Sequence, residues 1–124
     1  MLMLHKDDAE HPVPEPLRST FRQIADAFVA GDFQLRDHSI SGVRPLDPDT
    51  AEWIADSIST YGDAIAPLNE ETWNRSVYRW MDGYWQALVD LTTISEPVSD
   101  LTLHAKLYEI DHDLVVTVDA VYVP

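Results

Sequence analysis

The chain has 124 residues, of which 22 are acidic and eight are basic, so its formal net charge is -14. Charge of this sign repels nucleic-acid phosphates and anionic lipids and attracts basic surfaces, so we expect neither a nucleic-acid nor a membrane partner. Cysteine is absent, which excludes disulfides, thiolate catalysis and cysteine-based metal sites. The length fits one domain, and a hydrophobic content of 45% is too high for a disordered acidic tail.

Residues 1–16 are predicted to form a flexible leader. Met1 to Leu4 is apolar for too few residues to form the core of a signal peptide or a membrane span. Pro12, Pro14 and Pro16 disfavour a regular element before the last of them has passed. We therefore expect one folded domain at 17–124, in a cytoplasmic protein.

Two amphipathic helices are predicted in the first half of this domain. The first follows the leader, and Gly31 ends it. Its apolar residues recur every three or four positions: Leu17, Phe21, Ile24, Ala25 and Phe28. The second begins with Asp47 as N-cap and Pro48 as first residue, and it ends at Gly62. Its apolar stripe is Ala51, Ile54, Ala55, Ile58 and Tyr61. Between the helices, residues 33–45 are predicted to be extended, as a short edge strand or an irregular segment.

The last fifty residues change to the alternating pattern of β-strands. Asp82-Gly83 is a strong signal for a two-residue hairpin turn. Counting outward from this turn places Trp80 opposite Trp85, with the apolar face toward the helices. The same register places Arg75 opposite Asp90 on the solvent side, where opposite charges attract.

A second hairpin is predicted around Asp111-His112. Counting outward pairs Ala105 with Val118 and His104 with Asp119. Farther from the turn, the same count pairs Leu103 with Ala120 and Leu101 with Tyr122. Helices followed by strands indicate an α+β protein. We predict a two-layer sandwich in which the two N-terminal helices pack on a four-stranded antiparallel β-meander.

The amino-acid sequence of the predicted strands resembles that of a family of small bacterial proteins of unknown function. The resemblance rests on the segment Trp85-Gln-Ala-Leu-Val-Asp-Leu-Thr, on Ser99-Asp-Leu-Thr-Leu and on the closing Val121-Tyr-Val-Pro. It covers most of the chain beyond the leader. It implies an α+β domain from a bacterium and provides no catalytic residues to carry over, because that family has no assigned activity.

The histidines and carboxylates do not form a catalytic or metal-binding motif. No pair among His5, His11, His38, His104 and His112 has the spacing that holds zinc on one helix face. His104 opposite Asp119 is interpreted as a polar pair on the solvent side, since no nucleophile accompanies it. We therefore expect no metal, no cofactor and no assignable reaction.

Acidic charge is the feature with the clearest functional implication. Residues 82–124 hold eight acids and one base, Lys106. The first hypothesis is a non-enzymatic module that binds a basic partner protein, such as an immunity- or antitoxin-type inhibitor. The candidate partner-binding residues are Asp90, Asp119, Glu109, Asp111, Asp113 and Trp53. Trp53 is included because it lies beside the apolar stripe of its helix and should be partly exposed.

Two alternatives come from other classes of protein. One is a small-molecule-binding or hydrolytic domain with a pocket between the helices and the sheet, lined by Tyr61, Trp73, Tyr78 and His104. The other is a homodimeric structural subunit, joined through an edge strand or through the surface around Trp53.

Overall fold

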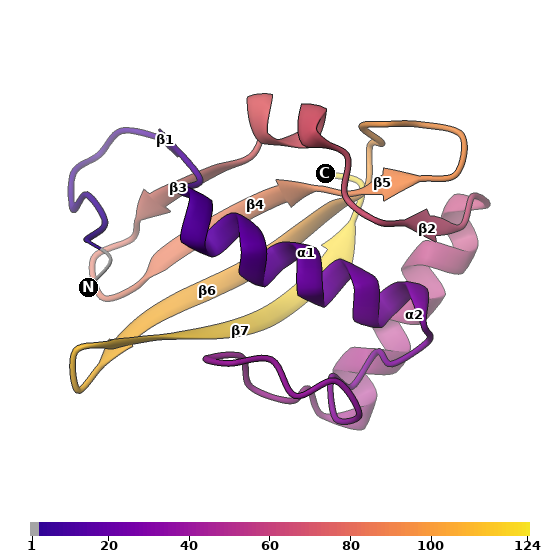
Figure 1. The fold of residues 1–124 in the computed structure, drawn as a ribbon, viewed down its shortest axis with the longest axis horizontal. Coiled ribbons are helices and arrows are strands. Elements are labelled where there is room, and N and C mark those ends of the chain that lie inside the picture. The colour runs from indigo at the N-terminus through magenta and orange to yellow at the C-terminus, as the bar shows by residue number, and fades with distance from the viewer. Residues whose placement is uncertain (1–2) are drawn as a thin grey trace.

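The computed structural model describes residues 3–124 (Figure 1). Its elements in chain order are β1 (His11–Pro12), α1 (Glu15–Val29), α2 (Pro48–Tyr61), β2 (Ile65–Ala66), a 3-10 helix η1 (Glu70–Asn74), β3 (Val77–Trp80), β4 (Trp85–Asp90), β5 (Thr92–Thr93), β6 (Thr102–Ile110) and β7 (Asp113–Tyr122). The main sheet has five antiparallel strands in the order β1-β3-β4-β6-β7, and β2 pairs separately with β5. The predicted α+β class is confirmed, whereas the predicted count of four strands is wrong.

The additional strand of the main sheet comes from the segment that was expected to be a leader. His11–Pro12 pairs with Val77 and Tyr78, and the next residue, Val13, is fully buried. A short edge strand tolerates proline because its N–H side needs no partner. Helix α1 then begins at Glu15, earlier than predicted, with Pro16 in its first turn, where a missing N–H costs nothing. Residues 1 and 2 of the expected leader lie outside the described residues.

Both helices have the predicted end signals. Gly31 has a φ of 86° and follows α1; its N–H bonds to the Phe28 carbonyl, and the Asp32 N–H bonds to the Ala27 carbonyl, which is the Schellman arrangement. Asp47 caps α2 by accepting a 2.8 Å hydrogen bond from the Thr50 N–H. Gly62, with a φ of 86°, ends α2 in the left-handed conformation.

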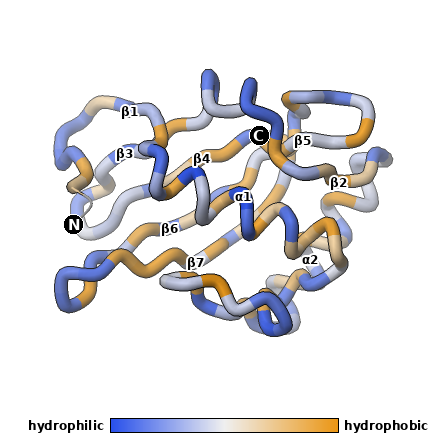
Figure 2. Tube along the Cα trace, viewed as in Figure 1, coloured by the Kyte–Doolittle hydropathy of each residue, from blue (hydrophilic) through white to orange (hydrophobic). Residues whose placement is uncertain are grey.

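The core lies between α1 and one face of the main sheet. Figure 1 shows α1 crossing this face, with α2 beside β7. In Figure 2 apolar residues recur along the strands and on both helices. Phe21 and Ile24 of α1, Ile54 of α2, and Leu103 and Leu107 of β6 are at most 1% exposed and belong to a single cluster.

The first hairpin has the predicted register. Val77 pairs with Leu88, and Trp80 pairs with Trp85. The predicted Arg75–Asp90 contact forms as an ion pair, with 3.3 Å between Nε and Oδ2. This face of the sheet was predicted to be mostly solvent-exposed, and the Asp90 side chain on it is 13% exposed.

The second hairpin follows the predicted register only near its turn. Ala105 pairs with Val118 as expected, but a β-bulge between His104 and Ala105 shifts the pairing beyond it. His104 therefore pairs with Ala120 rather than Asp119, and Leu103 pairs with Val121 rather than Ala120. The bulge also pairs Tyr122 with Thr102 instead of Leu101. It thus moves Tyr122 to the face opposite α1.

Residues 33–45 form a loop rather than an edge strand. Their β contact is one isolated parallel bridge between Val43 and Val116. Leu35 is buried in this loop with a φ of 55°. Within residues 3–124, no helix combines the length and the apolar character needed to cross a bilayer.

Candidate functional site

An open groove lies between α2 and the end of β7. It has a volume of about 560 Å³ and is bordered by Trp53, Asp56, Tyr61, Leu101, Tyr122 and Val123, with two hydroxyl side chains between them. Trp53 is 53% exposed, Tyr122 is 39% exposed and Val123 is 51% exposed. Exposed large apolar side chains gathered in one place are typical of an interaction surface, so we call this region the Trp53 groove.

Three rings lie in a row that starts at the groove and continues onto the adjacent face of the sheet. The Trp53 and Tyr122 ring centroids are 6.4 Å apart with an interplanar angle of 21°, and those of Tyr122 and His104 are 4.3 Å apart with an angle of 7°. The bulge in the second hairpin makes this row, because it turns Tyr122 onto the same sheet face as His104. Trp53 forms the exposed end of this row.

Carboxylates surround Trp53 on its own helix. Asp49 and Asp56 lie four residues before and three residues after Trp53, spacings that place side chains on the same face of a helix. Both are exposed, as is Glu52. Helix α2 contains no basic residue, and among residues 3–124 no ion pair within 4.0 Å engages these three carboxylates. Asp49 and Asp56 therefore flank Trp53 with negative charge that no ion pair within residues 3–124 neutralises.

The other tryptophans are covered by basic side chains of the protein itself. Lys6 lies 5.1 Å from the Trp80 ring centroid and 5.5 Å from that of Trp85. Arg18 and Arg22 each lie 5.5 Å from the ring of Trp73. Of the four tryptophans in the described chain, Trp53 alone has no such cation over its ring. Its exposed indole can therefore accept a cation from another molecule.

The structure separates the acidic residues predicted to bind a partner. Glu109, Asp111 and Asp113 lie at the tip of the β6–β7 hairpin, about 26 Å from the end of β6 that borders the Trp53 groove, at ~3.3 Å per residue. Glu109 lies 4.0 Å from the Lys6 amine. The predicted set therefore does not form one continuous site.

Asp90 and Asp119 lie nearer the groove but are paired within the protein. The Asp90 carboxylate bonds to Arg75 and accepts a 3.1 Å hydrogen bond from the Thr102 hydroxyl. Asp119 lies 3.8 Å from the Lys106 amine. Because they are paired internally, Asp90 and Asp119 offer a partner less free negative charge than the carboxylates of α2 do.

The four residues of the alternative pocket do not converge. Trp73 and Tyr78 are buried in the core, at 5% and 3% exposed. Tyr61 borders the Trp53 groove and donates a 2.5 Å hydrogen bond to Glu96, which raises the pKa of its hydroxyl. His104 lies on the opposite face of the sheet from Tyr78.

His104 should titrate below the ordinary histidine pKa of 6.5. Burial lowers its pKa, and the negative charge of Asp119 opposes this shift without cancelling it. Because the folded protein then holds fewer protons than the unfolded chain, the stability contributed by neutral His104 is present above pH 6.5. It is lost as the pH falls through the folded-state pKa. NMR titration of the histidine rings measures this value directly.

Asp119 provides a check on that assignment. Asp119→Asn removes the attraction that holds the proton, so it should lower the His104 midpoint further. Asp113→Asn, at the far end of the hairpin, should leave the midpoint unchanged. A midpoint at or above 6.5 in the unmodified protein would contradict the assignment.

The fold and the groove define a small α+β domain that exposes an aromatic and acidic surface. The chain belongs to a family described as a domain of unknown function, DUF7668, whose profile matches residues 25–124. The strand sequences were predicted to resemble a family without an assigned function, and membership of such a family is confirmed. Searches of the curated proteins and of the solved structures found no match.

Sequence reasoning identified Trp53 but missed its neighbours. Tyr122 was paired with Leu101 because the bulge could not be anticipated. Neither Asp49 nor Asp56 is among the residues predicted to bind a partner. The signal that was available is their spacing of four and three residues from Trp53, combined with the absence of lysine and arginine from residues 48–61.

Proposed function

We propose that this protein is a non-enzymatic module that binds a basic partner protein through the Trp53 groove. The observation that carries the proposal is the exposed Trp53 indole, stacked on Tyr122 and flanked on its helix by unpaired Asp49 and Asp56. A lysine or arginine of the partner would lie over the indole and form ion pairs with these carboxylates. An inhibitor of the immunity or antitoxin type, in a bacterium, is one form that such a module takes.

The chemistry of the groove supports a protein partner over a substrate. Tryptophan and tyrosine are the residues most often found at the energetic centre of protein interfaces. The surrounding charge steers a basic partner and speeds its capture at low salt. The same charge opposes the approach of a second copy of this chain, which carries the same net charge of -14.

The test is affinity capture from the native host with the full chain as bait, at low and at high salt. The expected partner is basic and is captured more strongly at low salt. Trp53→Ala should weaken its binding by about 30-fold or more, the effect of losing about 2 kcal/mol at an interface hot spot. Because Trp53 is exposed, this variant should keep the fold, which circular dichroism checks.

Two matched charge variants sharpen the result. Asp49→Asn with Asp56→Asn should lower the association rate and its dependence on salt. Asp111→Asn with Asp113→Asn removes the same charge at the far end of the molecule and should leave binding intact. A captured protein that binds Trp53→Ala as well as the unmodified chain would refute the groove as the docking site. Light scattering that showed a dimer dissolved by Trp53→Ala would assign the groove to self-association instead.

A further inference from the structure

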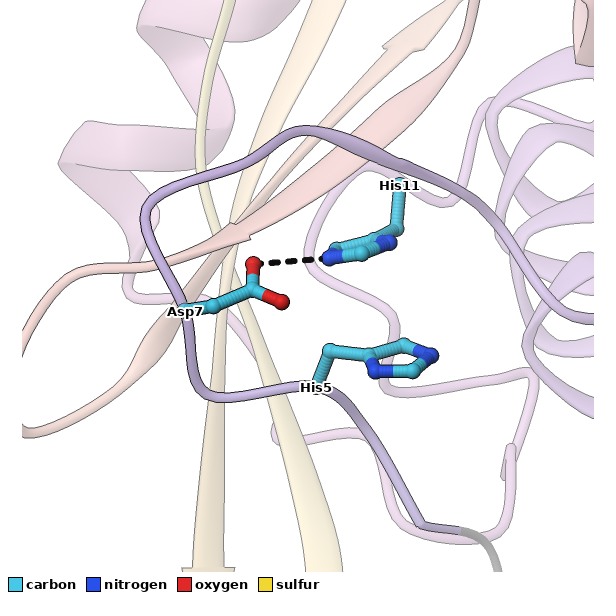
Figure 3. Close-up of side chains that lie close together, drawn as sticks. All are labelled: His5, Asp7 and His11. Atoms are coloured by element: carbon cyan, nitrogen blue, oxygen red, sulfur yellow. Dashed lines mark hydrogen bonds and ion pairs between the residues drawn. The ribbon is translucent and has the colours of Figure 1, made fainter.

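Two histidines and an aspartate come together in the N-terminal segment, away from the Trp53 groove. The ligand atoms of His5, Asp7 and His11 all lie within 4.8 Å of one another, and His11 Nε2 is 2.8 Å from Asp7 Oδ1. Figure 3 shows the three side chains pointing into the curve of the loop that residues 5–11 form. We refer to them as the His5–Asp7–His11 cluster.

Contacts to buried aromatic side chains hold the loop in this shape. The His5 N–H donates a 3.0 Å hydrogen bond to the Tyr78 hydroxyl, and the His5 carbonyl accepts a 2.9 Å hydrogen bond from the Trp85 indole. Tyr78 and Trp85 belong to the core, at 3% and 2% exposed. The backbone of His5 is thus fixed to the sheet by groups other than its own ring.

The other two members of the cluster are fixed separately. His11 lies in β1, where it pairs with Tyr78. Asp7 Oδ1 accepts a 3.0 Å hydrogen bond from the Ala9 N–H, which closes a turn between the two histidines. The backbone therefore brings the three side chains together before any ligand binds. This lowers the conformational entropy that ligand binding would cost.

The donor set is the one that zinc uses. Zn²⁺ binds imidazole nitrogen and carboxylate oxygen at about 2.0–2.2 Å, so ligand atoms around a tetrahedral ion lie roughly 3.4 Å apart. The present separations reach up to 4.8 Å and the two imidazole rings are stacked, so a ring must turn out of the stack for both nitrogens to point at one ion. The side chain of Asp7 is 53% exposed and that of His11 is 22% exposed, so solvent can supply the remaining ligands.

We propose that His5, Asp7 and His11 bind one divalent transition-metal ion of the zinc class. The ion would replace the proton shared by His11 and Asp7 and would draw the stacked His5 ring, whose centroid is 4.2 Å from that of His11, into the same coordination sphere. The ion binds only the arrangement in which residues 5–11 lie on the sheet, so it should stabilise the docked segment. Its position outside residues 25–124 makes this a feature of the present chain beyond the part that matches the family.

The experiment is calorimetric titration of the tag-free, full-length protein with zinc chloride at neutral pH. We expect one ion per chain and a higher melting temperature with zinc than with a chelator. His5→Asn, Asp7→Asn and His11→Asn should each weaken binding by at least about tenfold, since even the loss of an outer-shell partner weakens metal affinity about 10- to 100-fold. Asparagine at position 7 retains an acceptor for the Ala9 N–H, so the turn should survive.

Matched controls and a second readout decide between outcomes. Asp8→Asn and His112→Asn each remove an exposed group of the same type and should leave zinc affinity unchanged. Zinc should shift the NMR signals of the His5 and His11 rings while leaving those of His104 in place. Absence of binding at one ion per chain would overturn the proposal, leaving a proton-mediated pair between His11 and Asp7. Binding that persists in all three ligand variants would overturn it as well.

Discussion

Phe21→Ala should lower the free energy of unfolding by about 3–5 kcal/mol, the range typical of phenylalanine truncation in a well-packed core. Phe21 lies on the buried face of α1, is 1% exposed and belongs to the main core cluster. Removing its ring loses the transfer free energy of the ring and leaves a cavity that rigid strands cannot fill. Urea unfolding measures the effect as a lower midpoint with an unchanged slope.

Gln23→Ala is the matched control on the same helix. Gln23 is exposed, and its side chain donates a 3.3 Å hydrogen bond to the Ser19 carbonyl of its own helix. Its substitution should change stability by less than about 0.5 kcal/mol. A loss of less than about 1 kcal/mol in Phe21→Ala would mean that α1 does not close the core. Because Phe21 precedes the family-matched residues 25–124, the result also decides whether the folded unit extends beyond that match.

Turn chemistry explains how much of the sheet the sequence predicts. Asp82 and Gly83 both have positive φ, at 58° and 135°, and a two-residue turn of this kind sets the register of every pair counted from it. The short first hairpin therefore has its predicted pairs from Trp80–Trp85 to Val77–Leu88. Asp111 and His112 also adopt positive φ, and the pairs nearest to them are those predicted.

The register of the second hairpin is lost where the alternation of residue types is lost. Ala120, Val121, Tyr122 and Val123 are all apolar, so no pattern shows which of them face the core. The bulge leaves Asp119 without a direct partner. The apolar run at residues 120–123 fits this shifted register as well as the regular one, so the sequence does not reveal the bulge. The row of rings at the Trp53 groove depends on this bulge, which is why the sequence predicts the exposure of Trp53 and not its stacking on Tyr122.

The short strands were unpredictable for a different reason. Two residues are too few to show a period, and the prolines around β1 argue against a strand unless its edge position is known. The His5–Asp7–His11 cluster depends on that strand, because β1 returns His11 to the neighbourhood of His5. A set of ligands on a loop has no helical spacing, so the absence of an i, i+4 histidine pair says little about it.

Asp32→Ala should lower the free energy of unfolding by about 2–3 kcal/mol, because a buried acceptor of several backbone N–H groups is lost. Asp32 follows the glycine that ends α1, and its side chain is 7% exposed. Its two oxygens accept hydrogen bonds of 2.9–3.2 Å from the backbone N–H groups of Arg36, Asp37 and His38. These bonds fold the loop that buries Leu35 against the core.

The effect should depend on pH in a defined direction. Burial tends to raise the pKa of Asp32, but hydrogen bonds from the His38 ring and from the three N–H groups outweigh it, so the pKa lies below the ordinary 3.8. The stability that ionised Asp32 contributes is therefore present above pH 3.8 and is lost as the pH falls through the folded-state pKa. The gap in stability between the unmodified protein and Asp32→Ala should be constant near neutral pH and should narrow in acid.

Two further substitutions separate the hydrogen bonds from the charge. Asp37→Ala removes a carboxylate from the same loop, while its N–H remains available to Asp32, so its effect should stay below about 0.5 kcal/mol. Asp32→Asn keeps one acceptor oxygen, so its loss of unfolding free energy should lie between those of Asp37→Ala and Asp32→Ala. If Asp37→Ala and Asp32→Ala destabilised the protein equally, the loop would respond to net charge alone.

Because residues 33–45 connect α1 to the Asp47 cap of α2, the loss of the Asp32 hydrogen bonds should also loosen the start of the helix that carries Trp53. Faster hydrogen exchange of the Thr50 and Ala51 amides in Asp32→Ala would show that the start of α2 is loosened.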